Sequence, residues 1–152
     1  MPEFSINISG HLETAKRFRD VANFLNSTKP MQRIVDSIKE GILVKTAKSH
    51  DYMGRNFKPY SKAYAKKKGS SRVNLRVSGE MMDSIDAEAT DPRHGKVSIG
   101  GDRALIALFH NKGGPRPGRP PQREFFNVSK SAIQNLAKKH IDDPIMKLLG
   151  RR

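Results

Sequence analysis

The spacing of apolar residues predicts two amphipathic helices in the first third of the chain. From His11 to about Asn26, apolar residues recur at steps of three and four, at Leu12, Ala15, Phe18 or Val21, Ala22 and Leu25. A polar break at residues 26–30 supplies Ser27 or Thr28 as a cap and Pro30 for a first helical turn. The second helix then runs to about Lys48, with an apolar face of Met31, Ile34, Val35, Ile38, Ile42 and Leu43.

The pattern further along is typical of short strands. Residues 3–9 alternate between apolar and polar side chains, which predicts a half-buried strand. Three more strands are expected at Ile85–Glu88, Lys96–Ile99 and Ala104–Phe109, separated by turn residues at 91–95 and 100–102. An antiparallel meander is the simplest arrangement of these three. A short helix over Leu75–Ile85 is expected just before them, with Met81, Met82 and Ile85 facing inward.

A last helix is expected from about Arg123 to Ile141, followed by a tail at 144–152 that begins at Pro144. Its predicted buried side consists of Phe125, Val128, Ala132, Ile133 and Leu136. The elements together predict a single α+β domain over residues 1–152. In this fold the N-terminal helix pair and the C-terminal helix pack on a small antiparallel sheet, with long basic loops at about 49–74 and 110–122.

Composition limits the partners of this fold. The 152 residues include 29 Lys and Arg against 15 Asp and Glu, a net charge of +14, which favours polyanions, acidic protein faces or anionic lipid. The absence of cysteine excludes disulfides and thiol catalysis. No apolar run is long enough for a membrane span, so we expect a soluble, unprocessed protein that does not bind membranes.

The positive charge is concentrated between Lys45 and Arg76, where ten basic residues face one acid, Asp51. Glycine and proline interrupt this stretch, which predicts an extended loop around a short helix near Ser61–Lys67. Aromatic residues lie among the cations, a mixture that nucleic-acid surfaces use for phosphate contact and stacking. Alternatively, Phe57, Pro59 and Tyr60 anchor the loop on a neighbouring subunit, with the lysines facing solvent.

The second loop is rich in glycine, proline and arginine. Arg116 and Arg119 could grip acidic groups on a partner or simply be solvated, and the sequence favours neither. No nucleophile and base, paired carboxylates or metal-ligand spacing is visible, and the five histidines are dispersed. We therefore expect a protein that is not an enzyme and has no cofactor or metal.

Five segments occur in an order that resembles the virion morphogenesis and tail-completion proteins of tailed bacteriophages. The first is a Gly-x-x-Phe-x-Pro-Tyr segment at 54–61 that leads into Lys66, Lys67 and Lys68. It is followed by Leu-x-x-Ser-Gly-x-Met-x-x-Ser-Ile at 75–85 and Val-Ser-Ile-Gly at 97–100. A strand-like segment ending in His-Asn-Lys-Gly-Gly at 107–114 and a Gly-Arg-Pro-Pro-Gln-Arg-Glu-Phe-Phe element at 118–126 complete the set.

The resemblance implies an α+β subunit of the phage neck that completes the tail and joins it to the head. It implies a ring, with six as the expected copy number, between the head connector or stopper protein and the tail terminator or tail tube protein, around the genomic DNA. The protein would be made in the bacterial cytoplasm and reside in the virion, without catalytic residues. The alternative is a stand-alone basic nucleic-acid-binding protein.

Two sets of residues are the candidate sites on this basis. The expected subunit or partner interface comprises Phe57, Pro59, Tyr60, Tyr64, Arg116, Arg119 and Arg123. The residues expected to face DNA are Lys62, Lys66, Lys67, Lys68 and Arg72.

Overall fold

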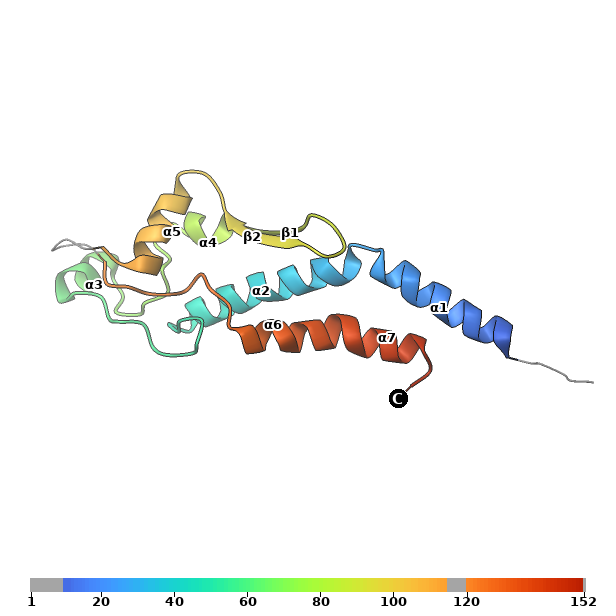
Figure 1. The fold of residues 1–152 in the computed structure, drawn as a ribbon. Coiled ribbons are helices and arrows are strands. Elements are labelled where there is room, and N and C mark those ends of the chain that lie inside the picture. Colours follow the sequence, from blue (N-terminus) through green and yellow to red (C-terminus); the bar gives the residue numbers. More distant parts are fainter. Residues whose placement is uncertain (1–9, 115–119, 152) are drawn as a thin grey trace, which may run out of the picture.

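The computed structural model describes residues 10–114 and 120–151. The fold is α+β, as expected, and elongated: α1 (His11–Leu25) lies at one end and α3 (Lys62–Lys68) at the other (Figure 1). Between them the sheet lies above α2 (Lys29–Ala47), and the C-terminal helices lie below it. The strand expected at residues 3–9 lies outside the described residues.

The helix pair is confirmed, but the two helices bury different proportions of their apolar faces. On α2, Ile34, Val35 and Ile42 are buried as the spacing predicts. No residue of α1 is buried, and Leu12 and Phe18 on its apolar face are 75% and 62% exposed. The apolar face of α1 stays exposed because α1 extends beyond the sheet, and its main contacts among the described residues are with α2 and the C-terminal α7.

The sheet is a two-stranded hairpin that packs along α2. Strands β1 (Ile85–Ala89) and β2 (Gly95–Ile99) are antiparallel, with Ile85 opposite Ile99. The side chain of Gln32 on α2 fixes the hairpin, since it donates to Ala87 O at 3.0 Å and accepts from the Ala89 amide at 2.9 Å. The packing is close at Gly95, where an added Cβ would lie 2.5 Å from a Val35 methyl group.

The third strand of the expected meander is instead a helix, α5 (Arg103–Lys112). The run Ala-Leu-Ile-Ala-Leu-Phe at 104–109 is a continuous apolar stretch, which periodicity alone cannot assign, and alanine and leucine are strong helix formers. The helix expected over Leu75–Ile85 is reduced to α4 (Glu80–Asp83), because Leu75 has a left-handed φ of 53°. Met81, Met82 and Ile85 are buried, as predicted.

The C-terminal helix begins later and continues further than expected. Residues 123–128 lie outside any helix, and α6 (Lys130–Ala137) begins where the Ser129 hydroxyl accepts the Ala132 amide at 3.2 Å. A π-helical turn (Lys138–Asp142) leads directly into α7 (Asp143–Leu148). Pro144 therefore does not separate a tail: it lies in the first turn of α7, where its missing N–H is tolerated.

The hydrophobic core lies at the α5 end of the molecule. It is built from one residue of α2, residues on either side of α3, and residues of α4, β1, α5 and the segment before α6. Its buried members are Ile42, Phe57, Val73, Leu75, Met81, Met82, Ile85, Ala107 and Phe125. Phe125 is buried as expected, although it precedes the helix, whereas Ile133 is 44% exposed.

Candidate functional site

The basic segment between α2 and α4 forms a folded arm, residues 48–76, around α3. The Ser61 hydroxyl caps α3 by accepting the Tyr64 amide at 3.3 Å, and Gly69 ends the helix with a left-handed φ of 72°. The short helix expected near Ser61–Lys67 is thus confirmed. Because α3 carries Lys62, Lys66, Lys67 and Lys68 on only two turns, the arm presents a dense positive charge.

A tight turn built on Asp51 begins the arm. One carboxylate oxygen of Asp51 accepts the amides of Met53 and Arg55, each at 2.9 Å, and the other accepts Arg55 Nε at 2.7 Å. Burial raises the pKa of this carboxyl group, but the hydrogen bonds from Arg55 and Met53 outweigh burial and leave the pKa below its ordinary value of 3.8. The single acid in the basic stretch therefore has a structural role.

Arg123 ties the arm to the C-terminal part of the chain. Its Nε donates to Lys58 O at 3.0 Å and its Nη2 donates to Pro59 O at 3.2 Å. The guanidinium carbon lies 4.9 Å from the centroid of the Tyr60 ring, a cation–π distance. Only 3% of Arg123 is exposed, and this burial lowers the pKa of its guanidinium. The buried Arg123 side chain thus connects two segments that are far apart in the sequence.

A second cation, Lys68, secures Tyr60 from the other part of the arm. Its Nζ lies 4.7 Å from the Tyr60 ring centroid and donates to Asn74 Oδ1 at 2.7 Å and to Tyr60 Oη at 3.2 Å. The ring of Tyr64 packs edge-on against Tyr60 at a centroid distance of 4.9 Å. Tyr60 is therefore the centre of the arm.

Beside this cluster lies an open cavity of about 450 Å³. It is lined by Tyr60, Ser61, Tyr64, His110, Pro120, Pro121 and Arg123. His110 contributes its backbone carbonyl, which accepts the Arg123 amide at 2.7 Å, while its buried Nδ1 has no hydrogen-bond partner among the described residues. Burial, together with the nearby Arg123 charge, lowers the pKa of His110, so this imidazole is neutral at physiological pH.

The predicted interface residues fall into three groups. Phe57 and Arg123 are buried within the chain, so their contacts are intramolecular and neither side chain can reach a partner without movement of the arm. Tyr60 is half-buried at the cavity, whereas Pro59 and Tyr64 are exposed, Tyr64 by 41%. Arg116 and Arg119 lie outside the described residues.

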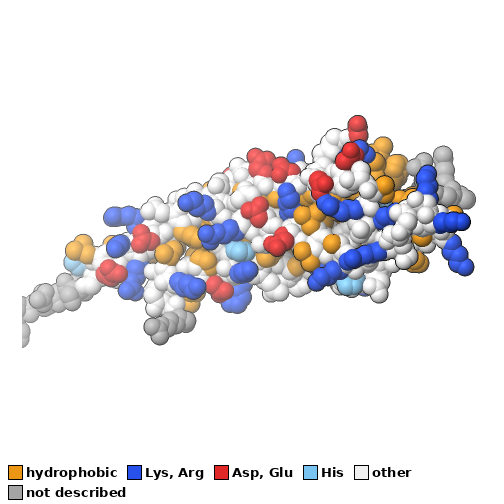
Figure 2. Space-filling model, turned by 180° about the vertical axis from the view of Figure 1, so that it is seen from behind, with side chains coloured by type: hydrophobic (Ala, Val, Ile, Leu, Met, Phe, Trp, Pro, Cys, Tyr) orange, Lys and Arg blue, Asp and Glu red, His pale blue; other side chains and the backbone are white. Residues whose placement is uncertain are grey.

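The residues expected to face DNA are more uniform. Lys62, Lys66, Lys67 and Arg72 are exposed, whereas Lys68 is half-buried and bound to Tyr60 and Asn74. Figure 2 shows Lys and Arg side chains along the whole length of this face, the α3 end included, and acidic side chains both at the upper edge and between the cations further toward α1. The exposed lysines of α3 therefore form the outer surface of the arm.

Sequence reasoning missed how the arm is held. It placed Arg123 at a partner interface, whereas the structure gives that side chain two carbonyl acceptors in the arm. It also grouped Lys68 with the solvated lysines and gave His110 no role. The placement of Arg123 between the prolines at 120–121 and the buried Phe125 was the available signal, because an arginine in such a setting can bury its stem.

In the part of the chain that the structure describes, no group of three or more His, Asp or Glu side chains is placed to hold a metal ion. None of the helices in the same part is both long enough and apolar enough to cross a bilayer.

No family model, curated protein or solved structure matches this chain.

Proposed function

We propose that this protein is a structural component of the neck of a tailed bacteriophage, which completes the tail and joins it to the head as a ring around the DNA channel. The order of the five segments that resemble tail-completion proteins is the sequence basis of this proposal. Their placement in the fold supports it, because the segments contribute Phe57, Leu75, Met81, Ala107 and Phe125 to one core.

The arm is the observation that carries the proposal. Arg123 and Lys68 hold it in place through Tyr60, so its form does not depend on a partner. The exposed lysines of α3 are thereby presented as a preorganised cationic surface. Such a surface suits a subunit that lies beside packaged DNA or grips an acidic face of a connector or tail protein.

The direct test is to locate the protein in particles of the phage or prophage that encodes it. Mass spectrometry of purified virions should detect the protein, and gold-labelled antibody should mark the junction of head and tail. Purified, infectious particles without the protein would refute the proposal.

A second test addresses the arm. The double variant Lys66→Glu with Lys67→Glu should fold normally, because both side chains are exposed, yet it should yield separated heads and tails. The matched control is Arg93→Glu with Lys96→Glu, which makes the same charge change at exposed positions of the hairpin. Normal particles from the arm variant would contradict the assigned role of the arm.

The alternative, a stand-alone nucleic-acid-binding protein, is favoured by one feature: Tyr64 is exposed on the same short helix as the lysines. Under this alternative the purified protein binds DNA with an affinity that falls steeply with salt, by a logarithmic slope of about 0.9 for each phosphate contact. Such binding, together with absence from particles, would favour the alternative.

A further inference from the structure

The first helix carries an apolar stripe that no other part of the described chain covers. Its members Leu12, Phe18 and Leu25 are 75%, 62% and 46% exposed. Ala15 and Ala22 lie on the same stripe and are also exposed. A helix whose apolar face is uncovered in its own chain is typical of one that packs against another molecule.

A second uncovered apolar surface lies at the other end of the molecule, on α5. Leu105, Ile106 and Leu108 are 57%, 39% and 45% exposed. Beside them is an apolar pocket of about 190 Å³, lined by Ile99, Ala104, Ala107, Leu108, Asn111 and Phe126. The pocket offers a hydrophobic seat for one large side chain.

Acidic residues are concentrated in the part of the chain that leads into α5. Residues 77–103 carry six acids and three bases in a chain whose net charge is +14. Of these acids, Glu80 and Asp83 are paired with Arg103 and Arg76, while Asp102 is exposed at the start of α5.

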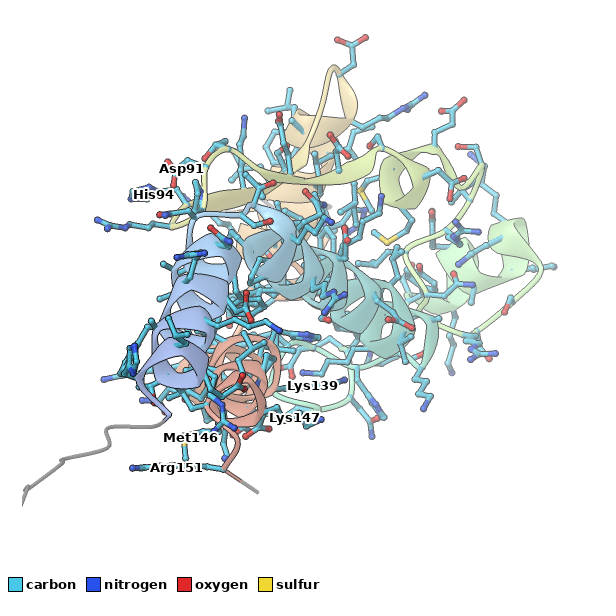
Figure 3. The ribbon with its side chains drawn as sticks, turned by 90° about the vertical axis from the view of Figure 1, so that its right-hand side faces the viewer. Asp91, His94, Lys139, Met146, Lys147 and Arg151 are labelled. Atoms are coloured by element: carbon cyan, nitrogen blue, oxygen red, sulfur yellow. The ribbon has the colours of Figure 1, made fainter. Side chains whose placement is uncertain are left out.

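The α1 end has the opposite character. Lys16 and Arg19 are exposed beside the stripe of α1. Figure 3, which views the molecule from this end, shows Lys147 and Arg151 on the neighbouring C-terminal segment. The helix α1 also carries Glu13, which pairs with Arg17, and Asp20. The exposed Asp102 at the start of α5 is thus available to pair with Lys16 or Arg19 of another copy.

The two surfaces cannot meet within one chain, because α1 and α5 lie at opposite ends of the molecule (Figure 1). Contact between two different surfaces of identical chains is heterologous, and a repeated heterologous contact builds a ring or a filament. We propose that α1 of one copy docks on α5 of the next copy, with Phe18 seated in the pocket beside Leu108 and Ala104. The inference builds on the proposed function, because it names the contact through which the proposed ring forms.

The chain contains no cysteine, which allows a direct test. Ala15→Cys places a thiol on the stripe and Ala104→Cys places one in the lining of the pocket, and both positions are exposed. With a short bis-maleimide at high protein concentration and low salt, the double variant should give a ladder of dimers, trimers and larger species. Each single variant should stop at dimers or give none, because it offers only one thiol.

Two controls identify the contact. Adding Phe18→Ser should reduce the cross-linked fraction at least about tenfold, as expected for loss of an aromatic anchor. Replacing Ala104→Cys with Lys66→Cys, which is exposed on the arm, should abolish the ladder. The proposal is overturned if the double variant gives no ladder, or if Phe18→Ser leaves the ladder unchanged.

A mixing experiment distinguishes a contact between two different surfaces from a contact between two identical ones. Phe18→Ser keeps an intact pocket, and Leu108→Asp keeps an intact stripe, so mixing the two variants should form heterodimers in sedimentation although neither variant associates alone. Failure of the mixture to associate would overturn the proposal. If the cross-linked ladder forms but the protein is absent from virions, only the proposed neck function is refuted. If the protein is found in the neck but no ladder forms, only the proposed contact between α1 and α5 is refuted.

Discussion

Replacing Arg123 with methionine should release the arm from the rest of the molecule. Arg123→Met keeps much of the buried stem but removes two charge-assisted hydrogen bonds, each worth about 1.5 kcal/mol, and a cation–π contact worth about 1 kcal/mol. Part of this loss is offset because a desolvated charge disappears. Water can also reach the freed carbonyls, since Lys58 and Pro59 are exposed. The expected net cost is about 2–3 kcal/mol.

Hydrogen exchange measures this cost where it acts. The Phe57 amide, bonded to Ser49 O at 2.8 Å, and the Ala65 amide, bonded to Ser61 O at 2.9 Å, report on opening of the arm. Their exchange should be faster by roughly 30- to 150-fold in the variant, while amides in the middle of α2 change much less. Arg93→Met, at an exposed position of the hairpin turn, is the control. Unchanged exchange at Phe57 and Ala65 in Arg123→Met would refute the conclusion that Arg123 holds the arm in place.

Three further perturbations test other contacts. Gly95→Ala should lower the unfolding free energy by about 1–3 kcal/mol, because its Cβ would lie 2.5 Å from a Val35 methyl, whereas Gly100→Ala, which meets nothing within 4 Å, should be nearly neutral in urea denaturation. Asp51→Asn should cost about 1–3 kcal/mol at neutral pH, and less in acid, because a carboxyl with a lowered pKa stabilises the fold above pH 3.8 and loses that effect as pH falls through its folded pKa. Because the pKa of His110 is lowered in the folded state, the stability of the protein should fall as pH drops below 6.5. Thermal melts of His110→Phe should show a weaker dependence on pH over this range.

The helices predicted best from the sequence are those with a long amphipathic repeat. The spacing located α1 and α2 to within a residue or two, because repeats of this length occur rarely by chance. The segment Ala104–Phe109 was misassigned because a six-residue apolar run suits a strand and a helix alike. The exposure of the stripe on α1 could not be predicted, since a repeat shows that a face is apolar but not which molecule covers it.

The candidate site was only partly predictable for a different reason. The sequence located the cations and aromatics of the arm, because they are close together along the chain. The contact between Arg123 and Lys58 spans 65 residues, and no local pattern encodes it. The π-helical turn was not predictable either, because Pro144 indicates a helix end in the sequence. In the structure Pro144 lies in the first turn of α7 and the helical segment continues through it.

The π-helical turn changes which neighbour the C-terminal helical segment contacts. A residue adds about 100° of rotation along a helix, so the one extra residue in the wide turn at 138–142 shifts the phase of everything after it. Before the shift the helix faces α2, and after it α7 faces α1. One continuous helical segment therefore packs against α2 along its first part and against α1 along its last part. Deleting one residue within 138–142 would rotate α7 by about 100° and should weaken its contact with α1.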